Sequence, residues 1–319
     1  MQNLSTSELA LITKVSRLYY EQKIRQPEIA KRLEISQSRV SRLLTQAVEI
    51  GVVRITIISP TSVYPELEEQ LKSKLGLRNV IVAHVDDDSE ESALSAIGSA
   101  GANYLETTLS GTDRIGLSSW SSTLLAVVDA MAPGASKARE FIQIQGGVGN
   151  PTAQVQATRL TDRFASVTGG EAKYLAAPGV VANKAVRDGL FEDPYIGQVA
   201  KDWNELTVAL LGIGALEPSK LLKDSGNTLS DEDLSSLRAA QAVGDVCLHY
   251  FDAAGKPVES ALDDRVIAIS AKQLLAIPRR IGFAGGKRKV DAILAAAKGN
   301  WIDVLITDSA TAEALLNAR

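Results

Sequence analysis

The N-terminal part of the chain repeats apolar positions with the period of an α-helix. In residues 5–22, apolar side chains recur three or four positions apart, which places them on one helix face. Pro27 favours the first turn of a short second helix, because proline's missing N–H would have no partner there. Ser36 is a suitable N-cap for a third helix over residues 37–50. Residues 52–58 alternate loosely and predict a short strand or wing.

Beyond a segment rich in proline and hydroxyl residues, short β-rich runs alternate with stretches of helical period. This alternation is typical of a mostly parallel sheet covered by helices on both faces. The fold predicted is α/β, with a helical domain at 1–58, a linker and connecting helix at 59–76, and a larger domain at 77–319. The expected strands are 80–84, 114–117, 141–145, 206–211, 246–251, 279–283 and 304–306. The expected helices of this part are 65–75, 90–109, 122–131, 153–167, 231–242, 286–297 and 309–317.

Charge separates the two parts of the chain. Residues 1–58 carry nine Lys and Arg against five Glu, a charge of +4, so the total of −4 leaves −8 for the remainder. A small basic domain on a larger acidic body suggests that the basic part meets a polyanion.

The rest of the composition excludes several classes of protein. Of the 319 residues, 45% are apolar and 23% charged, an ordinary globular balance, and no apolar run is long enough to cross a bilayer. No secretory signal is visible in residues 1–20, and the single cysteine, Cys247, fits a reducing cytoplasm. Two histidines and one cysteine argue against a zinc site. We therefore expect a cytoplasmic protein with no metal and no membrane contact.

The third predicted helix carries polar side chains at its start, on the face turned away from its apolar stripe. Arginine there suits guanine and glutamine suits adenine, and recognition helices contact bases with their N-terminal residues. A plain three-helix bundle with a solvated polar face is the alternative. The predicted DNA-binding residues are Gln26, Gln37, Ser38, Arg39, Ser41 and Arg42.

Residues 26–53, QPEIAKRLEISQSRVSRLLTQAVEIGVV, resemble the helix-turn-helix of bacterial transcription regulators. Ala30, Val40 and Leu43 match the core positions of that motif. The motif usually has glycine in its turn, where this chain has Glu34. The turn would therefore be strained if φ is positive at this residue.

Three loops of small and polar residues follow expected strands, where parallel α/β sheets bind ligands. Residues 116–123 offer five hydroxyls and a helix start, which suits a phosphate, although a helix N-cap with spare serines explains them equally well. Residues 145–150, QGGVGN, lack the glycine spacing of a dinucleotide loop, and no P-loop is present, so no cofactor is expected. Residues 284–289 place three cations at a helix start, which is unfavourable unless an anion compensates.

Taken over its whole length, the chain resembles the SorC/DeoR type of sugar-responsive bacterial regulator. Each matching segment is weak alone, but their order along the chain is specific. The segments are LYYEQKIRQPEIAKRLEISQSRVSRLL, GLSSWSSTL, IQIQGGVGN, LAAPGVVAN, ALLGIGAL, AVGDVCLHYFDAAGKPV, FAGGKRKVDAIL and VLITDSATAEALL. The resemblance implies a Rossmann-like, doubly wound effector domain similar to sugar-phosphate isomerases and deaminases.

The resemblance also implies a site for a phosphorylated sugar or a related polyol. The hydroxyl-rich loop and Lys289 would hold the phosphate, and the residues lining the sugar would include Asp245. Ser121 replaces a usual glycine, Ser309 replaces a usual acidic residue, and an aspartate is missing near Thr207, so an unphosphorylated polyol stays open. The predicted effector-binding residues are Ser119, Trp120, Ser121, Ser122, Thr123, Gly146, Gly147, Asp245, Gly285, Gly286 and Lys289.

These observations predict a transcriptional regulator of a carbohydrate or polyol catabolic operon, controlled by its effector and not an enzyme. A short recognition helix contacts too little DNA alone, so we expect a homodimer or homotetramer on double-stranded operator DNA. One alternative is an active sugar-phosphate isomerase or deaminase fused to a DNA-binding domain, with Asp245 or Asp308 as base. Another is a constitutive DNA-binding protein whose larger domain only oligomerises.

Overall fold

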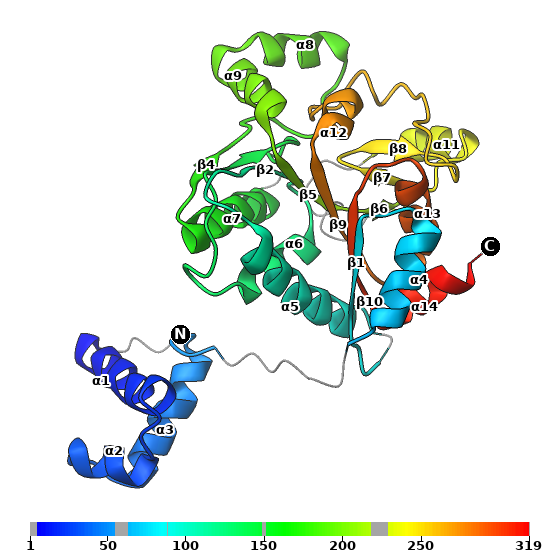
Figure 1. The fold of residues 1–319 in the computed structure, drawn as a ribbon. Helices are drawn as coiled ribbons and strands as arrows, with labels where there is room; N and C mark the ends of the chain where they lie inside the picture. The colour runs from blue at the N-terminus through cyan, green and yellow to red at the C-terminus, as the bar shows by residue number, and fades with distance from the viewer. Residues whose placement is uncertain (1–4, 55–62, 88, 149–150, 218–228, 319) are drawn as a thin grey trace. The chain divides into compact units, whose positions relative to one another are not determined.

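The structure, a computed structural model, describes residues 5–54, 63–87, 89–148, 151–217 and 229–318. The chain divides into two units, Met1–Ser59 and Pro60–Arg319, drawn in Figure 1. Within the described residues, every helix is too short or too polar to cross a bilayer.

Three helices make up the N-terminal unit. Helix α1 (Thr6–Ser16) continues into a π-helical turn (Arg17–Glu21), and α2 (Gln26–Arg32) and α3 (Gln37–Glu49) follow. Ser36 caps α3 with its hydroxyl, as its position in the sequence predicts. A small apolar core joins the three helices and consists of Ile12, Val15, Ile29, Ala30, Val40, Leu43, Leu44 and Ala47.

The turn between α2 and α3 has a positive φ at Glu34, a conformation that is strained for a residue other than glycine. Glu34 adopts a φ of 53°, in the left-handed region. For a residue with a Cβ atom this conformation costs about 1–2 kcal/mol, which glycine avoids. Residues 52–54 do not form the predicted strand, and the rest of the predicted wing lies outside the described residues.

A sheet of seven parallel strands forms the centre of the second unit, in the order β1-β10-β9-β5-β2-β3-β4. From β2 the chain adds strands in one direction, and from β5 it adds them in the other. The order therefore reverses between β2 and β5, where α/β sheets open a ligand crevice. The strands are β1 (Asn79–Ala83), β2 (Arg114–Leu117), β3 (Glu140–Gln143), β4 (Glu171–Lys173), β5 (Val208–Gly212), β9 (Arg279–Phe283) and β10 (Val304–Asp308).

Helices cover both faces of this sheet, and each face has its own apolar core (Figure 1). One face is covered by α5 (Glu90–Thr108), α6 (Ser122–Ala130) and α7 (Pro151–Thr168). Helix α4, predicted as a connecting helix, buries Leu71 in the core of the second face. The helices of that face are α4 (Pro65–Leu75), α9 (Pro194–Asp202), α12 (Ala271–Ala276), α13 (Val290–Lys298) and α14 (Ser309–Asn317), with α8 (Lys184–Glu192) packed at its margin.

A smaller antiparallel sheet lies beside the large one and corrects one prediction. It consists of β6 (Gly214–Ala215), β7 (Gly244–Val246) and β8 (His249–Phe251), and α11 (Asp231–Ala239) precedes β7. The single strand predicted over 246–251 is wrong, because the chain reverses at Cys247 and Leu248. Their φ angles are 52° and 64°, the conformation of a two-residue hairpin turn that is usually made by Asn and Gly.

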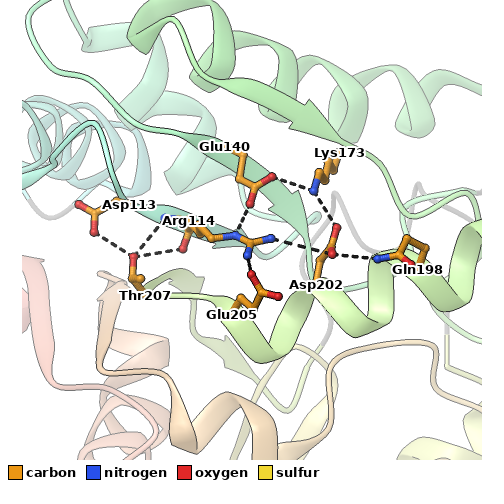
Figure 2. A network of polar contacts seen from close by, with 8 residues as sticks. All are labelled: Asp113, Arg114, Glu140, Lys173, Gln198, Asp202, Glu205 and Thr207. Atoms are coloured by element: carbon orange, nitrogen blue, oxygen red, sulfur yellow. Dashed lines mark hydrogen bonds and ion pairs between the residues drawn. The ribbon is translucent and has the colours of Figure 1, made fainter.

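A network of ionic contacts closes the amino ends of β2 and β3 (Figure 2). Arg114 forms ion pairs with Glu140 and Glu205, and its guanidinium lies 3.9 Å from Asp202. The Lys173 ammonium lies 2.8 Å from Glu140 and 2.7 Å from Asp202. Burial pulls the pKa of Lys173 down, but these two carboxylates outweigh it and raise the pKa above its usual value. Because charges pair with charges here, the network holds α9 against the sheet and leaves no cation for a ligand.

Candidate functional site

A narrow cavity of about 90 Å³ opens at the carboxyl ends of β2 and β5, where the strand order reverses. Its walls come from the loop after β2, the end of β5, the β7–β8 hairpin and a 3₁₀ turn before α13 (Lys287–Lys289). The lining includes two cations, Arg288 and Lys289, and two carboxylates, Glu217 and Asp245. The cavity can therefore take a ligand with both an anionic group and hydroxyls.

Most hydroxyls of the loop after β2 are used by the protein itself. Ser118 accepts a hydrogen bond from the Gly212 N–H at 3.1 Å, which ties β2 to β5. Ser119 donates to the Gln145 carbonyl at 2.7 Å. Ser121 caps α6 and accepts the Leu124 N–H at 3.1 Å. These three side chains therefore hold the shape of the cavity, and their hydroxyls are already hydrogen-bonded within the protein.

Ser122 and Thr123 differ from their neighbours in this loop. Thr123 is buried and Ser122 is exposed, and both line the cavity at the start of α6. Neither hydroxyl forms a hydrogen bond within the part of the chain that the structure describes. A helix start supplies unpaired N–H groups and a positive dipole end, so this corner suits an anion. Both predicted roles of the loop therefore apply to different residues. Ser121 is the N-cap of α6, and Ser122 and Thr123 form the candidate anion site.

The loop after β3 supports the cavity more than it lines it. The Trp120 indole, on the cavity wall, donates to the Gly146 carbonyl at 3.0 Å. A Cβ atom on Gly146 would lie 2.2 Å from the Pro178 carbonyl oxygen, so only glycine fits. Gln145 does line the cavity, is 4% exposed, and its side-chain amide makes no hydrogen bond with the described residues. Gln145 is not among the effector-binding residues predicted from the sequence, where its place directly before the glycine pair is its only signal.

Asp245 on β7 faces the cavity and also holds the hairpin turn. Its carboxylate accepts the Leu248 N–H at 3.0 Å. Burial raises the pKa of Asp245 to about 6, although the Leu248 N–H and the charge of Lys289 act in the opposite direction. Gly214 pairs with Asp245 across the small sheet, and a Cβ atom there would lie 1.9 Å from a carboxylate oxygen of Asp245. Glycine at 214 therefore makes room for the carboxylate.

Lys289 brings an ammonium group to the cavity wall. Its ammonium forms no hydrogen bond or ion pair with the described residues, whereas Arg288 pairs with Glu90 at 2.8 Å. Burial lowers the pKa of Lys289 to about 8, and the charge of Arg288 adds to this effect, while Asp245 and Glu90 oppose it. An anion beside Lys289 would favour its charged form and so oppose the lowering of its pKa.

The glycines before Lys289 are held by the end of β10 and the start of α14. The Gly286 N–H donates to Asp308 at 3.2 Å and to Thr311 at 2.7 Å, and its φ of 94° suits glycine. A Cβ atom on Gly285 would lie 2.1 Å from an Asp308 oxygen. Asp308 also accepts the N–H and hydroxyl of Thr311, so this carboxylate, one of the two candidate bases, positions a loop.

The structure thus separates the predicted effector residues into three groups. Gly285 lines a neighbouring cavity that shares Ser122, Thr123, Arg288 and Lys289 with the first. Ser119, Gly146, Gly147 and Gly286 are not among the lining residues of either cavity. The predicted residues that line the main cavity are Trp120, Ser121, Ser122, Thr123, Asp245 and Lys289.

The N-terminal unit presents the predicted DNA-binding residues on its surface. Gln37, Ser38, Arg39, Ser41 and Arg42 are exposed on α3, and Gln26 at the start of α2 is partly exposed. Two other arginines of this unit form ion pairs four residues apart, Arg17 with Glu21 and Arg32 with Glu28. Arg39 and Arg42 form no ion pair with the described residues.

Metal binding finds no support in the described part of the chain. There, no three His, Cys, Asp or Glu side chains gather as a metal site requires.

Comparisons with known proteins give the family. Residues 60–317 match the family model described as "Putative sugar-binding domain". The chain is 32% identical to the sorbitol operon regulator of Klebsiella pneumoniae over 98% of this chain and 99% of the regulator. It is 32% identical to the deoxyribonucleoside regulator of Bacillus subtilis, over 96% and 97% of the two chains.

A solved structure extends the likeness to the whole chain. The crystal structure of the full-length sorbitol operon regulator SorC from Klebsiella pneumoniae superimposes with a TM-score of 0.72 at 30% identity. The match covers 98% of this chain and all of that one. The chain therefore belongs to the sugar-binding family of SorC- and DeoR-type transcriptional regulators.

Proposed function

We propose that this protein is a sugar-responsive transcriptional regulator of a carbohydrate or polyol catabolic operon. The effector binds in the cavity at the ends of β2 and β5, and α2, the turn and α3 form a helix-turn-helix that binds operator DNA. The observation that carries the proposal is Lys289, a partly desolvated cation that no described residue pairs with closely, beside the start of α6 in that cavity.

The same corner favours a phosphorylated effector over a neutral polyol. A phosphate placed there would accept hydrogen bonds from Thr123 and the N–H groups that begin α6, and would pair with Lys289. Asp245 and Gln145, on the other walls, would bind hydroxyls of the sugar. A neutral polyol would form only the hydroxyl contacts with Asp245 and Gln145.

A binding experiment tests this assignment. Sugar phosphates, free sugars and polyols are screened by thermal shift, since a ligand that prefers the native state raises its stability. Binding is then followed by the fluorescence of Trp120, whose ring lies on the cavity wall. Lys289→Ala should weaken a phosphorylated effector strongly and a neutral polyol little. The site is wrongly placed if Trp120 emission is constant and if Lys289→Ala and Thr123→Ala bind like the wild type.

The DNA-binding assignment has its own test, with a matched control. Arg39→Ala and Arg42→Ala should abolish operator preference, because losing one good base contact costs about 1–3 kcal/mol. Arg17→Ala is the control, since Arg17 is equally exposed but lies on the π-helical turn and pairs with Glu21. Equal operator affinity in all three variants would show that α3 does not bind the bases.

We also propose that the protein acts as a homodimer or homotetramer. One recognition helix contacts few base pairs, and paired helix-turn-helix units on repeated half-sites supply the missing contact area. Sedimentation of the protein with and without DNA measures this directly. A 33.9 kDa species that stays monomeric at micromolar concentration on DNA contradicts the proposal.

One observation favours a second candidate, an active sugar-phosphate isomerase or deaminase. The pKa of Asp245 is raised to about 6 and that of Lys289 lowered to about 8, values suited to a base and an acid near neutral pH. The relatives are named as regulators, which favours the first proposal. Turnover assays on pentose and hexose phosphates, with Asp245→Asn as the inactive reference, decide between the two.

A further inference from the structure

Two cavities of the second unit meet at a single side chain. Behind the effector cavity lies an open groove of about 550 Å³, bounded by α8, α9, β8 and the start of α12. These elements lie together at one end of this unit in Figure 1. Tyr250 lines both the effector cavity and the groove.

The position of Tyr250 explains how one residue can face both spaces. It stands opposite Asp245 in the β7–β8 pair, so the two share the face of the small sheet that looks into the effector cavity. It belongs to an apolar cluster with Leu248 on the cavity side and Val266 on the groove side. Tyr250 is 4% exposed, so its ring fills the space between the two cavities.

The groove offers a different chemistry from the cavity. Its walls include the aromatic rings of Phe191 and Trp203 and the apolar side chains of Val258 and Val266. The charged side chains on its margin are mostly acidic, with Asp188, Glu259 and Asp263 beside a single arginine, Arg187, which contacts Asp188 at 2.9 Å. The groove thus suits an uncharged extension of a ligand and not a second phosphate.

Most other walls of the cavity are fixed by hydrogen bonds. Ser118 ties β2 to β5, Ser119 ties the loop after β2 to the loop after β3, and Asp308 ties the loop before α13. The Tyr250 hydroxyl makes no hydrogen bond with the described residues. Burial raises the pKa of this phenol, so the side chain is neutral and is held by apolar packing alone. The Tyr250 side chain can therefore be removed without breaking a polar contact to the described residues.

We propose that Tyr250 sets the upper length of the effector by closing the cavity against the groove. The inference rests on the proposed function, because it assumes that the effector binds in this cavity with its phosphate at Lys289. An effector of one sugar unit ends before Tyr250. A second sugar unit would collide with the ring, and would enter the groove if the ring were absent.

The experiment compares short and long phosphorylated probes on the full-length protein. Dissociation constants for ribose 5-phosphate, glucose 6-phosphate and trehalose 6-phosphate are measured on the wild type, Tyr250→Ala and Tyr250→Leu. Tyr250→Leu keeps an apolar side chain in the cluster and serves if Tyr250→Ala does not fold. Val258→Ala, which changes the groove but not the effector cavity, is the matched control.

The wild type should bind the better monosaccharide phosphate at least about tenfold more tightly than trehalose 6-phosphate. Both Tyr250 variants should reduce that ratio by about tenfold or more, and Val258→Ala should leave it unchanged. An unchanged ratio in both Tyr250 variants, or a wild type that binds the disaccharide equally well, overturns the proposal. If no probe binds the wild type in a manner that depends on Lys289, the proposed effector site itself fails, and this inference fails with it.

Discussion

Replacing Gly214 by alanine should disturb the effector site without touching any ligand contact directly. The added Cβ atom would lie 1.9 Å from an Asp245 carboxylate oxygen and 3.0 Å from its carboxyl carbon, and its three nearest atoms all belong to Asp245. Carboxylate and methyl cannot both stay in place, so Asp245 must rotate away. The rotation breaks its hydrogen bond to the Leu248 N–H, which supports a turn of two residues with positive φ.

The expected size of the effect follows from that bond. A hydrogen bond to a charged group contributes about 1.5–3 kcal/mol, so Gly214→Ala should destabilise the second unit by about 2 kcal/mol. For a domain of this size the melting temperature should fall by roughly 4–8 °C. Effector affinity should fall by about tenfold or more if Asp245 binds a sugar hydroxyl, since 1.4 kcal/mol corresponds to a factor of ten.

Two comparisons make the assay decisive. Gly189→Ala on α8 is the control, because a Cβ atom there meets nothing within 4 Å, and this variant should melt at or above the wild-type temperature. In an Asp245→Ala background, the second substitution Gly214→Ala should cost almost nothing, because the displaced group is absent. An equal cost in both backgrounds would refute the reasoning, as would a Gly214→Ala variant with wild-type stability and affinity.

Three further outcomes are expected. Affinity for a phosphorylated effector should fall as pH rises through about 8, where Lys289 loses its proton, and isothermal titration should show this dependence vanish in Lys289→Met. Glu34→Gly should stabilise the N-terminal unit by about 1 kcal/mol in denaturant unfolding, because glycine accepts the positive φ without strain. Asp303→Ala should destabilise the second unit by about 3 kcal/mol in the same assay, because it leaves the nearly buried Arg280 without its carboxylate; full wild-type stability would show that the pair contributes nothing.

The sequence predicts the central strands well because they are nearly continuous apolar runs bounded by polar residues. The expected bounds of β2 and β9 agree with the structure. β4 (Glu171–Lys173) was not predicted, because it is short, lies at the sheet edge and carries two charged residues. The β7–β8 hairpin was not predicted because its turn residues, Cys247 and Leu248, are apolar. They continue the apolar pattern of the two strands, so the sequence shows no turn there.

The candidate site was harder to predict than the fold, because it depends on orientation and register. The sequence places Ser119, Ser121 and Thr123 in one loop. It does not show which of their hydroxyls form hydrogen bonds within the protein. Tyr250 was missed because its place beside the cavity follows from its pairing with Asp245, which depends on the unpredicted hairpin. Lys289 could be predicted, since a cation at a helix start is a local mismatch that the sequence itself displays.

At the carboxyl edge of the sheet, some polar side chains are hydrogen-bonded to described residues and others are not. This difference explains physically how the protein could sense an effector. Ser118, Ser119 and Asp308 are hydrogen-bonded and hold the loops, whereas the side chains of Thr123 and Lys289 form no hydrogen bond with the described residues. The second pair costs free energy in the unliganded state, because a partly desolvated cation lacks a partner. An anion that pairs with Lys289 removes that cost only in the folded state, and at a hundredfold excess over its dissociation constant it adds about 2.7 kcal/mol of stability. Such a gain arises where the two halves of the sheet meet, so ligand binding there would join β2, β5 and α13 by contacts added to those that the protein makes alone.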